Sequence, residues 1–137
     1  MTPADQTRDL IQRYYNAFNA ADMDAFLGLL HEQVCHDINQ GGRQIGRAAF
    51  ADFMARMNRC YREQIADLTV MASEDGRRAA AEFTVLGEYL ATDDGLPPAS
   101  GQRYRLPAGA FFEIRDGRVA RISNFYNLND WLAQVRG

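Results

Sequence analysis

The second half of the chain is a succession of long alternating segments separated by short turns, and this order constrains the fold most. Asp75-Gly76 and Asp116-Gly117 are typical of β-hairpin turns, because Gly readily adopts the positive φ that such turns need. Segment 92–101, rich in Asp, Gly and Pro, is a loop by composition. The turns and the loop separate four segments: 65–73, 78–90, 102–115 and 118–127. The pattern predicts a meander of long antiparallel strands.

The first half of the chain carries helical patterns instead. Residues 2–5, Thr-Pro-Ala-Asp, supply an N-cap, a proline at the first helical position and an acid one turn in. Apolar residues within 10–18 then recur at helical spacing. Asp22 can cap a second helix, apolar residues within 50–61 mark a third, and a short helix at 130–135 closes the chain.

Asp37 is the most unusual residue of the short strand predicted between the second and third helices. It lies in a half-apolar, β-branched run at 34–38, which Asn39-Gln40-Gly41-Gly42 ends with a turn. An acid on the inward face of such a strand is desolvated, which raises its pKa and makes it a candidate proton acceptor. Alternatively, Asp37 only caps the Gly-Gly turn. In a regular strand, His36 points to the opposite side.

Together these elements predict an α+β fold in which three N-terminal helices pack on one face of a curved antiparallel sheet. Residues 1–137 are enough for one domain with a substantial core and too few for two. Long strands flanked by amphipathic helices can bend into a cone. The interior of that cone is the expected ligand site.

Composition excludes several functions. All 15 basic residues are Arg, so lysine Schiff-base chemistry is excluded. The arginines are scattered and the pI is near 5.3, which argues against nucleic-acid binding. No apolar run reaches about 18 residues and no signal-peptide pattern begins the chain, so we expect a cytoplasmic protein without a membrane contact.

No cofactor and no metal are expected from the sequence. The two histidines, His31 and His36, lack metal-ligand spacing, and His31 fits the last turn of the second helix, where a positive charge suits the dipole. No Gly-rich phosphate loop joins a strand to a helix, so nucleotide binding is not expected.

Several segments resemble the steroid Δ-isomerase (ketosteroid isomerase) family. They include Gln12-Arg13-Tyr14, residues 19–24, Val34 to Asp37, Phe83-Thr84-Val85 and the strand pair around Asp116-Gly117. Within the superfamily of SnoaL-like polyketide cyclases and nuclear transport factor 2-like proteins, the run 36–42 is similar to the group related to ketosteroid isomerase. The resemblance implies a cone-shaped nuclear transport factor 2-like (cystatin-like) roll.

The resemblance also implies catalytic roles, which in this family are an established example of pKa tuning. By this resemblance the base corresponds to Asp37 and the oxyanion-binding tyrosine to Tyr14. The neighbouring Tyr15 is an alternative to Tyr14, because only one of the two is expected to face inward fully. The second oxyanion donor falls on Gly109, which has no side chain, and Met54 replaces a supporting tyrosine. Losing one oxyanion donor typically costs roughly 10²–10³ in rate, so strong steroid isomerase activity is not expected.

The same resemblance outlines a pocket for a flat, hydrophobic, oxygen-bearing molecule of steroid, polyketide or terpenoid type. On the last strand, Asn124 either donates to a substrate oxygen or is a strand residue without a ligand role, and Tyr126 either bonds Asp37 or lines the pocket. The pocket set is Phe53, Met54, Phe83, Val85, Tyr89, Gly109, Phe111, Asn124 and Tyr126.

The two faces of segment 102–115 are expected to differ in their partners. Arg103 and Arg105 share the alternating face of Phe111, which the resemblance turns inward unless a β-bulge swaps the faces, and an inward arginine would favour a carboxylate ligand. The opposite face is expected to be buried in a homodimer, as in the family, and consists of Tyr104, Leu106, Phe112 and Ile114.

Two functions remain after the sequence is read. The first is an isomerase-like enzyme, or a cyclase or lyase acting by proton transfer, in which Asp37 is the general base. The alternative is a non-catalytic dimeric domain of the same fold that binds a small molecule or serves as a scaffold. Asp37 favours the enzyme, whereas Gly109 and Met54 favour loss or change of activity.

Overall fold

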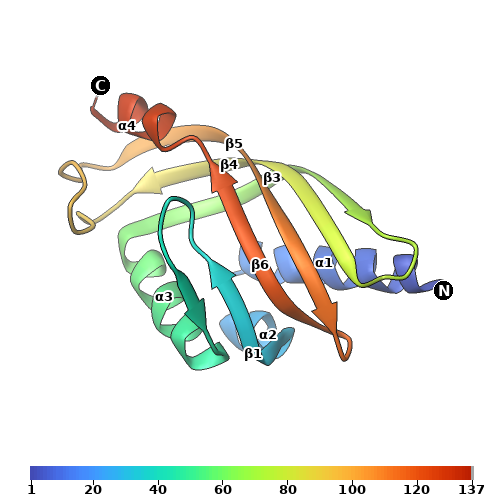
Figure 1. The fold of residues 1–137 in the computed structure, drawn as a ribbon. Helices are drawn as coiled ribbons and strands as arrows, with labels where there is room; N and C mark the ends of the chain where they lie inside the picture. Colours follow the sequence, from blue (N-terminus) through green and yellow to red (C-terminus); the bar gives the residue numbers. More distant parts are fainter. Residues whose placement is uncertain (137) are drawn as a thin grey trace.

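A six-stranded sheet forms the frame of the molecule, with strand order β2-β1-β6-β5-β4-β3 (Figure 1). The structure is a computed structural model and describes residues 1–136. The helices are α1 (Pro3–Asn19), α2 (Met23–Gly28), α3 (Arg47–Cys60) and α4 (Leu128–Arg136). The strands are β1 (Leu30–Asp37), β2 (Arg43–Ile45), β3 (Tyr61–Ala72), β4 (Arg78–Tyr89), β5 (Gln102–Arg115) and β6 (Arg118–Tyr126). The predicted α+β architecture, helices on a curved and mostly antiparallel sheet, is confirmed.

The meander β3-β4-β5-β6 follows the predicted turns. Neighbouring strands pair antiparallel along its whole length. Both Asp-Gly turns have the expected left-handed backbone, with φ of 72° at Gly76 and of 56° and 70° at Asp116 and Gly117. Only β1 departs from this pattern among the described strands, because it pairs parallel with β6.

Helix α1 begins and lies as its sequence predicts. Thr2 accepts a hydrogen bond from the Asp5 backbone N–H, and the Asp5 side chain accepts one from the Thr2 N–H, which completes a capping box. Asp22 caps α2 with a single hydrogen bond, which its side chain accepts from the Ala25 backbone N–H. Figure 1 shows α1 behind the sheet, so one sheet face is covered by helices and the other is open to the viewer.

Three elements differ from the prediction. Tyr61 begins β3 instead of ending the third helix, so β3 is longer at its start than the predicted segment 65–73. Strand β2 is only three residues long and carries little periodicity of its own. His31 lies on β1 rather than in a helix, and its Nε2 is 3.5 Å from Asp116. No helix among residues 1–136 is long and apolar enough to cross a membrane.

The inward face of the sheet, defined here as the face that packs against the helices, contains the aromatic core. Phe112 of β5 contacts Tyr14 and Tyr15 of α1, with ring centroids 5.6 and 6.2 Å apart. Tyr15 also meets Phe83 of β4 at 5.1 Å. These edge-to-face contacts fix which alternate residues of each strand point toward the helices.

The expected faces of β5 are reversed in the structure. The register pairs Phe83 with Ala108, and Tyr104 and Leu106 are buried on the inward side with Phe112. The other alternate set points outward and is exposed: Arg103, Arg105 and Phe111. Alternation along a strand separates its side chains into two faces but does not say which face is covered by the helices. Here the helices cover the face of β5 that was expected to form the dimer interface.

We predict that Gly87→Ala destabilises the fold. A Cβ at Gly87 would lie 2.2 Å from Cζ of the buried Tyr104 ring, and such overpacking costs about 1–3 kcal/mol. Denaturant unfolding measures the loss. Gly28→Ala is the control, since a Cβ there meets nothing within 4 Å, and it should be neutral or slightly stabilising. Equal stability of the two variants would contradict the close approach.

Candidate functional site

Strand β1 presents two neighbouring titratable side chains to opposite faces of the sheet. His36 is in register with Ile122 of β6 and Gln44 of β2, on the inward face. Asp37 is in register with Ser123 and Arg43, on the outward face. The prediction that the two residues point in opposite directions is therefore confirmed, but the direction of each is the reverse of the one expected.

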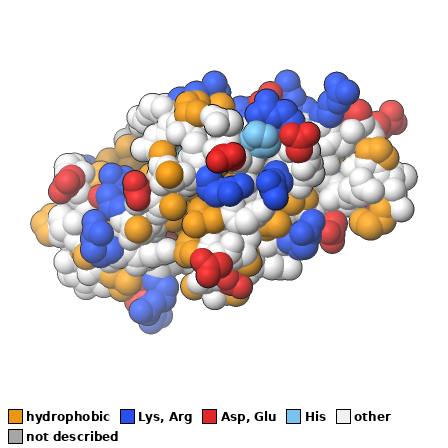
Figure 2. Space-filling model, turned by 90° about the horizontal axis from the view of Figure 1, so that it is seen from below, with side chains coloured by type: hydrophobic (Ala, Val, Ile, Leu, Met, Phe, Trp, Pro, Cys, Tyr) orange, Lys and Arg blue, Asp and Glu red, His pale blue; other side chains and the backbone are white. Residues whose placement is uncertain are grey.

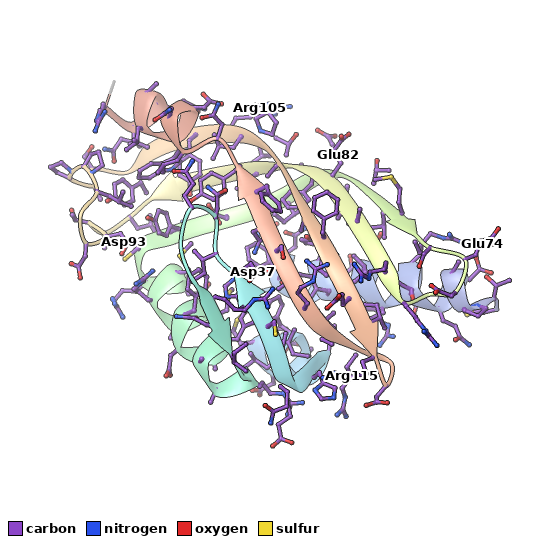
Figure 3. All side chains as sticks on the ribbon, in the orientation of Figure 1. Asp37, Glu74, Glu82, Asp93, Arg105 and Arg115 are labelled. Carbon is purple, nitrogen blue, oxygen red and sulfur yellow. The ribbon has the colours of Figure 1, made fainter. Side chains whose placement is uncertain are left out.

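Asp37 is an outward ion-pair residue. Its carboxylate accepts hydrogen bonds from Arg43 Nε at 2.6 Å, Arg43 Nη2 at 3.0 Å and Ser123 Oγ at 2.5 Å. The Arg43 hydrogen bonds, supported by Ser123 and the charge of Arg121, lower the pKa of Asp37 to about 2. The expectation of an inward acid with a raised pKa is wrong, because the guanidinium outweighs the desolvation. Figure 3 shows Asp37 on the sheet side facing the viewer, away from α1.

Asp37 belongs to a chain of alternating charges across the outward face. Arg121 Nη1 donates to Ser123 Oγ at 2.6 Å, and Arg121 Nε is 3.3 Å from Glu113. Glu113 in turn lies 3.2 Å from Arg78. Arginines and acids are likewise interspersed on the face seen in Figure 2, so no field of one sign forms there.

His36 takes the inward position and is only 2% exposed. Its ring stacks on Phe50 with centroids 4.2 Å apart and meets the edge of Phe53 at 4.6 Å. Burial lowers the pKa of His36 to about 4, although the charge of Asp37 opposes the shift, so the imidazole is neutral at pH 7. Its Nδ1 has no hydrogen-bond partner among residues 1–136.

Two amide side chains beside His36 are also incompletely bonded. Among residues 1–136, buried Gln44 Oε1 has no hydrogen-bond partner. Asn39 Oδ1 accepts a hydrogen bond from the Tyr126 backbone N–H at 3.2 Å, and buried Asn39 Nδ2 has no partner at hydrogen-bond distance among these residues, although the Asn39 side chain lowers the pKa of the Tyr126 hydroxyl. Buried polar atoms in native proteins are nearly always bonded, so three such atoms from β1, β2 and their connecting turn point to a ligand-binding role. We call His36, Asn39 and Gln44 the polar triplet.

A continuous set of contacts leads from the polar triplet to the opposite strands. Arg56 lies over the Phe53 ring at 5.6 Å and 3.7 Å from Asp93. Asp93 accepts a hydrogen bond from Tyr61 at 2.9 Å, and the Tyr61 ring stacks on Tyr89 at 5.3 Å. Figure 3 shows Asp93 in the loop at the opposite end of the sheet from Glu74.

The contacts end at a half-buried acid on β3. Tyr104 Oη donates to Glu63 Oε2 at 2.5 Å, and the Tyr104 ring meets Trp131 of α4 at 6.0 Å. Burial raises the pKa of Glu63, and the Tyr104 hydrogen bond only partly offsets this. No sequence motif indicated Glu63, because Tyr61 was assigned to the third helix and the strand was expected to begin at residue 65. The alternation of Tyr61, Glu63 and Ile65 was the one available signal.

Tyr14 and Tyr15 are both buried, so the expectation that only one could face inward fully is wrong. The Tyr14 ring packs on Phe26 at 4.6 Å and on Tyr15 at 4.9 Å. Burial raises the pKa of both hydroxyls, and Tyr15 Oη has no partner. The helix turns far enough between adjacent positions for the two rings to pack edge to face within one core.

The structure divides the expected pocket residues between the two faces. Gly109 is in register with Glu82 and Phe125, so it lies on the outward side with Phe111, and both expectations are corrected. Tyr126 faces inward and meets Asn39 rather than Asp37. The remaining expected residues belong to the helix-covered side: Phe53, Met54, Phe83, Val85, Tyr89 and Asn124.

Two surface hollows lie apart from the polar triplet. A cleft of about 750 Å³ runs between the start of α1 and the two hairpin turns, and its wall includes Arg13, Arg77 and Asp116. A groove of about 540 Å³ on the outward face is lined by Phe111, Phe125 and Ser123 among others. Among the described residues, no group of three or more His, Cys, Asp or Glu side chains is arranged to hold a metal ion.

Helices packed on one face of a curved, six-stranded and mostly antiparallel sheet form a nuclear transport factor 2-like fold. A nuclear transport factor 2-like protein of unknown function from Burkholderia pseudomallei superposes with a TM-score of 0.81 at 14% identity, covering 96% of this chain and 98% of that one. At this identity the match shows the fold alone.

The chain belongs to the SnoaL-like domain family, whose model matches residues 11–122. A crystal structure described as a putative polyketide cyclase from Pseudomonas putida is 63% identical, with a TM-score of 0.94 and 98% coverage of both chains. A second protein of the same description, from Xanthomonas campestris, is 54% identical with a TM-score of 0.95, covering 98% of this chain and 99% of that one. No protein with a curated description matches the chain.

We predict that Asp37→Asn weakens the fold in a pH-dependent way. The pKa of Asp37 is about 2 in the folded protein, below the value near 3.9 of an unfolded chain, so its stabilising effect is present above about pH 4 and is lost as the pH falls through 2. The variant should lose about 1 kcal/mol of unfolding free energy at pH 7, after allowance for solvent screening, and almost nothing near pH 2.

Chemical unfolding at the two pH values measures this difference. Asp9→Asn is the control, because Asp9 forms an exposed pair with Arg13 on α1 and should change stability by only a few tenths of a kcal/mol. A carboxyl pKa of 4 or higher for Asp37 by NMR would contradict the ion pair.

Proposed function

We propose that this chain is an enzyme of the polyketide cyclase type, which binds a flat, apolar, oxygen-bearing molecule on the inward face and rearranges its carbon skeleton by proton transfer. The observation that carries the proposal is the polar triplet, in which the ring of His36 packs against Phe50 and Phe53. Such an apolar wall with a few convergent polar groups is typical of small-molecule sites. The two relatives described as putative polyketide cyclases support the choice of reaction class.

The triplet matches the oxygens of a polyketide. Asn39 Nδ2 is a hydrogen-bond donor suited to a ketone oxygen, whereas Gln44 Oε1 is an acceptor suited to a hydroxyl or enol. Neutral His36 offers Nδ1 as either one, depending on its tautomer. Alternating ketone and hydroxyl groups therefore fit this set better than the single ketone of a steroid isomerase substrate. Inward-facing Ala108 and Ala110 of β5 offer no side-chain donor for a steroid dienolate.

We predict that His36→Phe and Gln44→Met weaken binding of 1-tetralone, a flat aromatic ketone, by roughly 2–10-fold each, since a hydrogen bond is worth about 0.5–1.5 kcal/mol. Gln44→Met keeps the volume of the side chain, whereas His36→Phe enlarges it somewhat, and each removes an unpaired buried polar atom, so the free protein should lose little stability. Isothermal titration and thermal unfolding measure the two effects. The matched control is Gln33→Met, on an exposed position of β1.

Unchanged affinity in both inward variants would contradict the proposed site. Tight binding of 1-tetralone and of cyclic polyketides without any turnover of linear poly-β-ketones would instead favour a non-catalytic binding domain of the same fold.

A homodimer through the outward face is the partner that we propose for the enzyme. Phe111 and Phe125 are each 54% exposed, and their rings touch at 5.8 Å. Met71 and Leu86 add exposed apolar surface on the same face. A two-fold axis would place this patch against its own copy, and the alternating charges from Arg43 to Arg78 can then meet opposite charges of the second chain.

We predict that Phe111→Glu converts a dimer to a monomer, because it places a charge in the centre of the apolar patch. Analytical ultracentrifugation measures the mass of the particle. The control is Leu90→Glu, at an exposed apolar residue just beyond the end of β4. A wild-type monomer at high protein concentration, or an unchanged dimer in Phe111→Glu, would contradict this interface.

A further inference from the structure

Glu63 is a half-buried carboxyl on the inward face that has no cationic partner among residues 1–136. No arginine contributes to its environment: burial raises its pKa, and the hydrogen bond from Tyr104 is the only opposing effect. Burial of an unpaired acid is costly, and groups poised in this way occur preferentially at functional sites. Its second oxygen, Oε1, has no protein partner and is not among the fully enclosed atoms. That oxygen is therefore open to a proton from a bound molecule.

The fold holds this acid in place through a specific arrangement. Glu63, Gly87 and Tyr104 are cross-strand neighbours on β3, β4 and β5. The missing side chain at Gly87 allows the Tyr104 ring to lie across β4, where a Cβ would be 2.2 Å from it. Trp131 of α4 supports the other side of the ring. The strands thus keep the Tyr104 hydroxyl at Glu63 Oε2 and leave Oε1 free.

Glu63 and the polar triplet face the same space. Tyr126, on the inward side of β6, donates its backbone N–H to Asn39 Oδ1. Burial raises the pKa of its hydroxyl, and the charge of Glu63 adds to this shift, so the hydroxyl lies within electrostatic range of Glu63. The contacts through Phe53, Arg56 and Asp93 connect them along a second route. A molecule bonded to the triplet and lying along Tyr126 is thereby directed toward Glu63.

We propose that Glu63 is the general base of the reaction, taking a proton from a carbon next to a ketone of the substrate. This inference rests on the proposed function, because it uses the ligand that the polar triplet would hold. The C–H bond breaks, its proton passes to Glu63 Oε1, and its electron pair forms the enolate. The enolate carbon then attacks a second ketone carbon of the same molecule, forming the ring C–C bond. The π electrons of that ketone become an alkoxide, which takes the proton back from Glu63.

Each partner of Glu63 has a defined part in this step. The Tyr104 hydrogen bond stabilises the carboxylate form, so the acid can release its proton again. The other titratable groups on this side are Tyr126 of β6, Tyr61 of β3 and Asp93 of the following loop. The neighbours on β4 and α4, Gly87 and Trp131, carry no charge. Arg56 of α3, also on this side, is paired with Asp93, and no arginine contributes to the pKa of Glu63.

Deuterium uptake at the α-carbon of 1-tetralone in heavy water, followed by NMR across a pH series, tests the proposal. The wild type should exceed the buffer rate and gain activity as the pH rises through the ionisation of Glu63. Glu63→Gln should lower the uptake roughly 10²–10⁴-fold with the affinity for 1-tetralone within about twofold. Glu82→Gln, an exposed glutamate on the outward side of β4, is the control and should leave the rate unchanged.

Tyr104→Phe provides a second variant that keeps the packing of the ring. It removes the hydrogen bond that lowers the pKa of Glu63, so the midpoint of the pH profile should move to higher pH, which a purely structural role would not cause. Binding of 1-tetralone without uptake above buffer, full uptake in Glu63→Gln, or an unmoved midpoint in Tyr104→Phe would each overturn the role of Glu63. Absence of binding to the wild type would instead overturn the proposed function itself.

Discussion

The pairing of β1 between β2 and β6 is the constraint on which both faces of the sheet depend. Arg43, Asp37 and Ser123 come from these three strands and meet at one point, so their hydrogen bonds hold the three strands in a single register. A slip by one residue would exchange the two sides of β1 and bring a carboxylate into the aromatic core. The ion pair on the open side of the sheet therefore determines that a neutral imidazole, and not an acid, lies inside.

The two faces of the sheet give their acids different roles. The outward acid, Asp37, stabilises the fold, whereas the inward acid, Glu63, is placed to exchange a proton with a ligand. Asp37 accepts hydrogen bonds from Arg43 and Ser123 and is partly exposed, so it stays ionised and stabilises the fold. Glu63 has one neutral donor and is desolvated by burial, so its ionised form costs free energy. Burying the unpaired polar atoms of the triplet also costs free energy of folding. Proteins commonly keep such costly groups where a ligand completes their hydrogen bonds.

The sequence was sufficient for the fold and insufficient for the site, for reasons that differ from residue to residue. Turns such as Asp75-Gly76 and caps such as Thr2 and Asp22 are local, because the residues that determine them are adjacent in the chain. The direction of a strand face is not local: it depends on which set of alternate residues the distant helices cover. That is why Asp37 and Phe111 were placed on the wrong side although their strands were predicted correctly. Glu63 could be recognised only once β3 was known to begin at Tyr61.

The aromatic cluster at the end of α4 has a spectroscopic consequence. Trp131 is the single tryptophan of the chain, and its ring lies 5.1 Å from Tyr89, 6.0 Å from Tyr104 and 6.2 Å from Tyr61. Tyrosines at this range transfer excitation to it, and the polarity around Tyr104 sets its emission. The native chain thus contains one fluorophore next to the acid of β3, so that titration and occupancy of this region can be followed optically without a label.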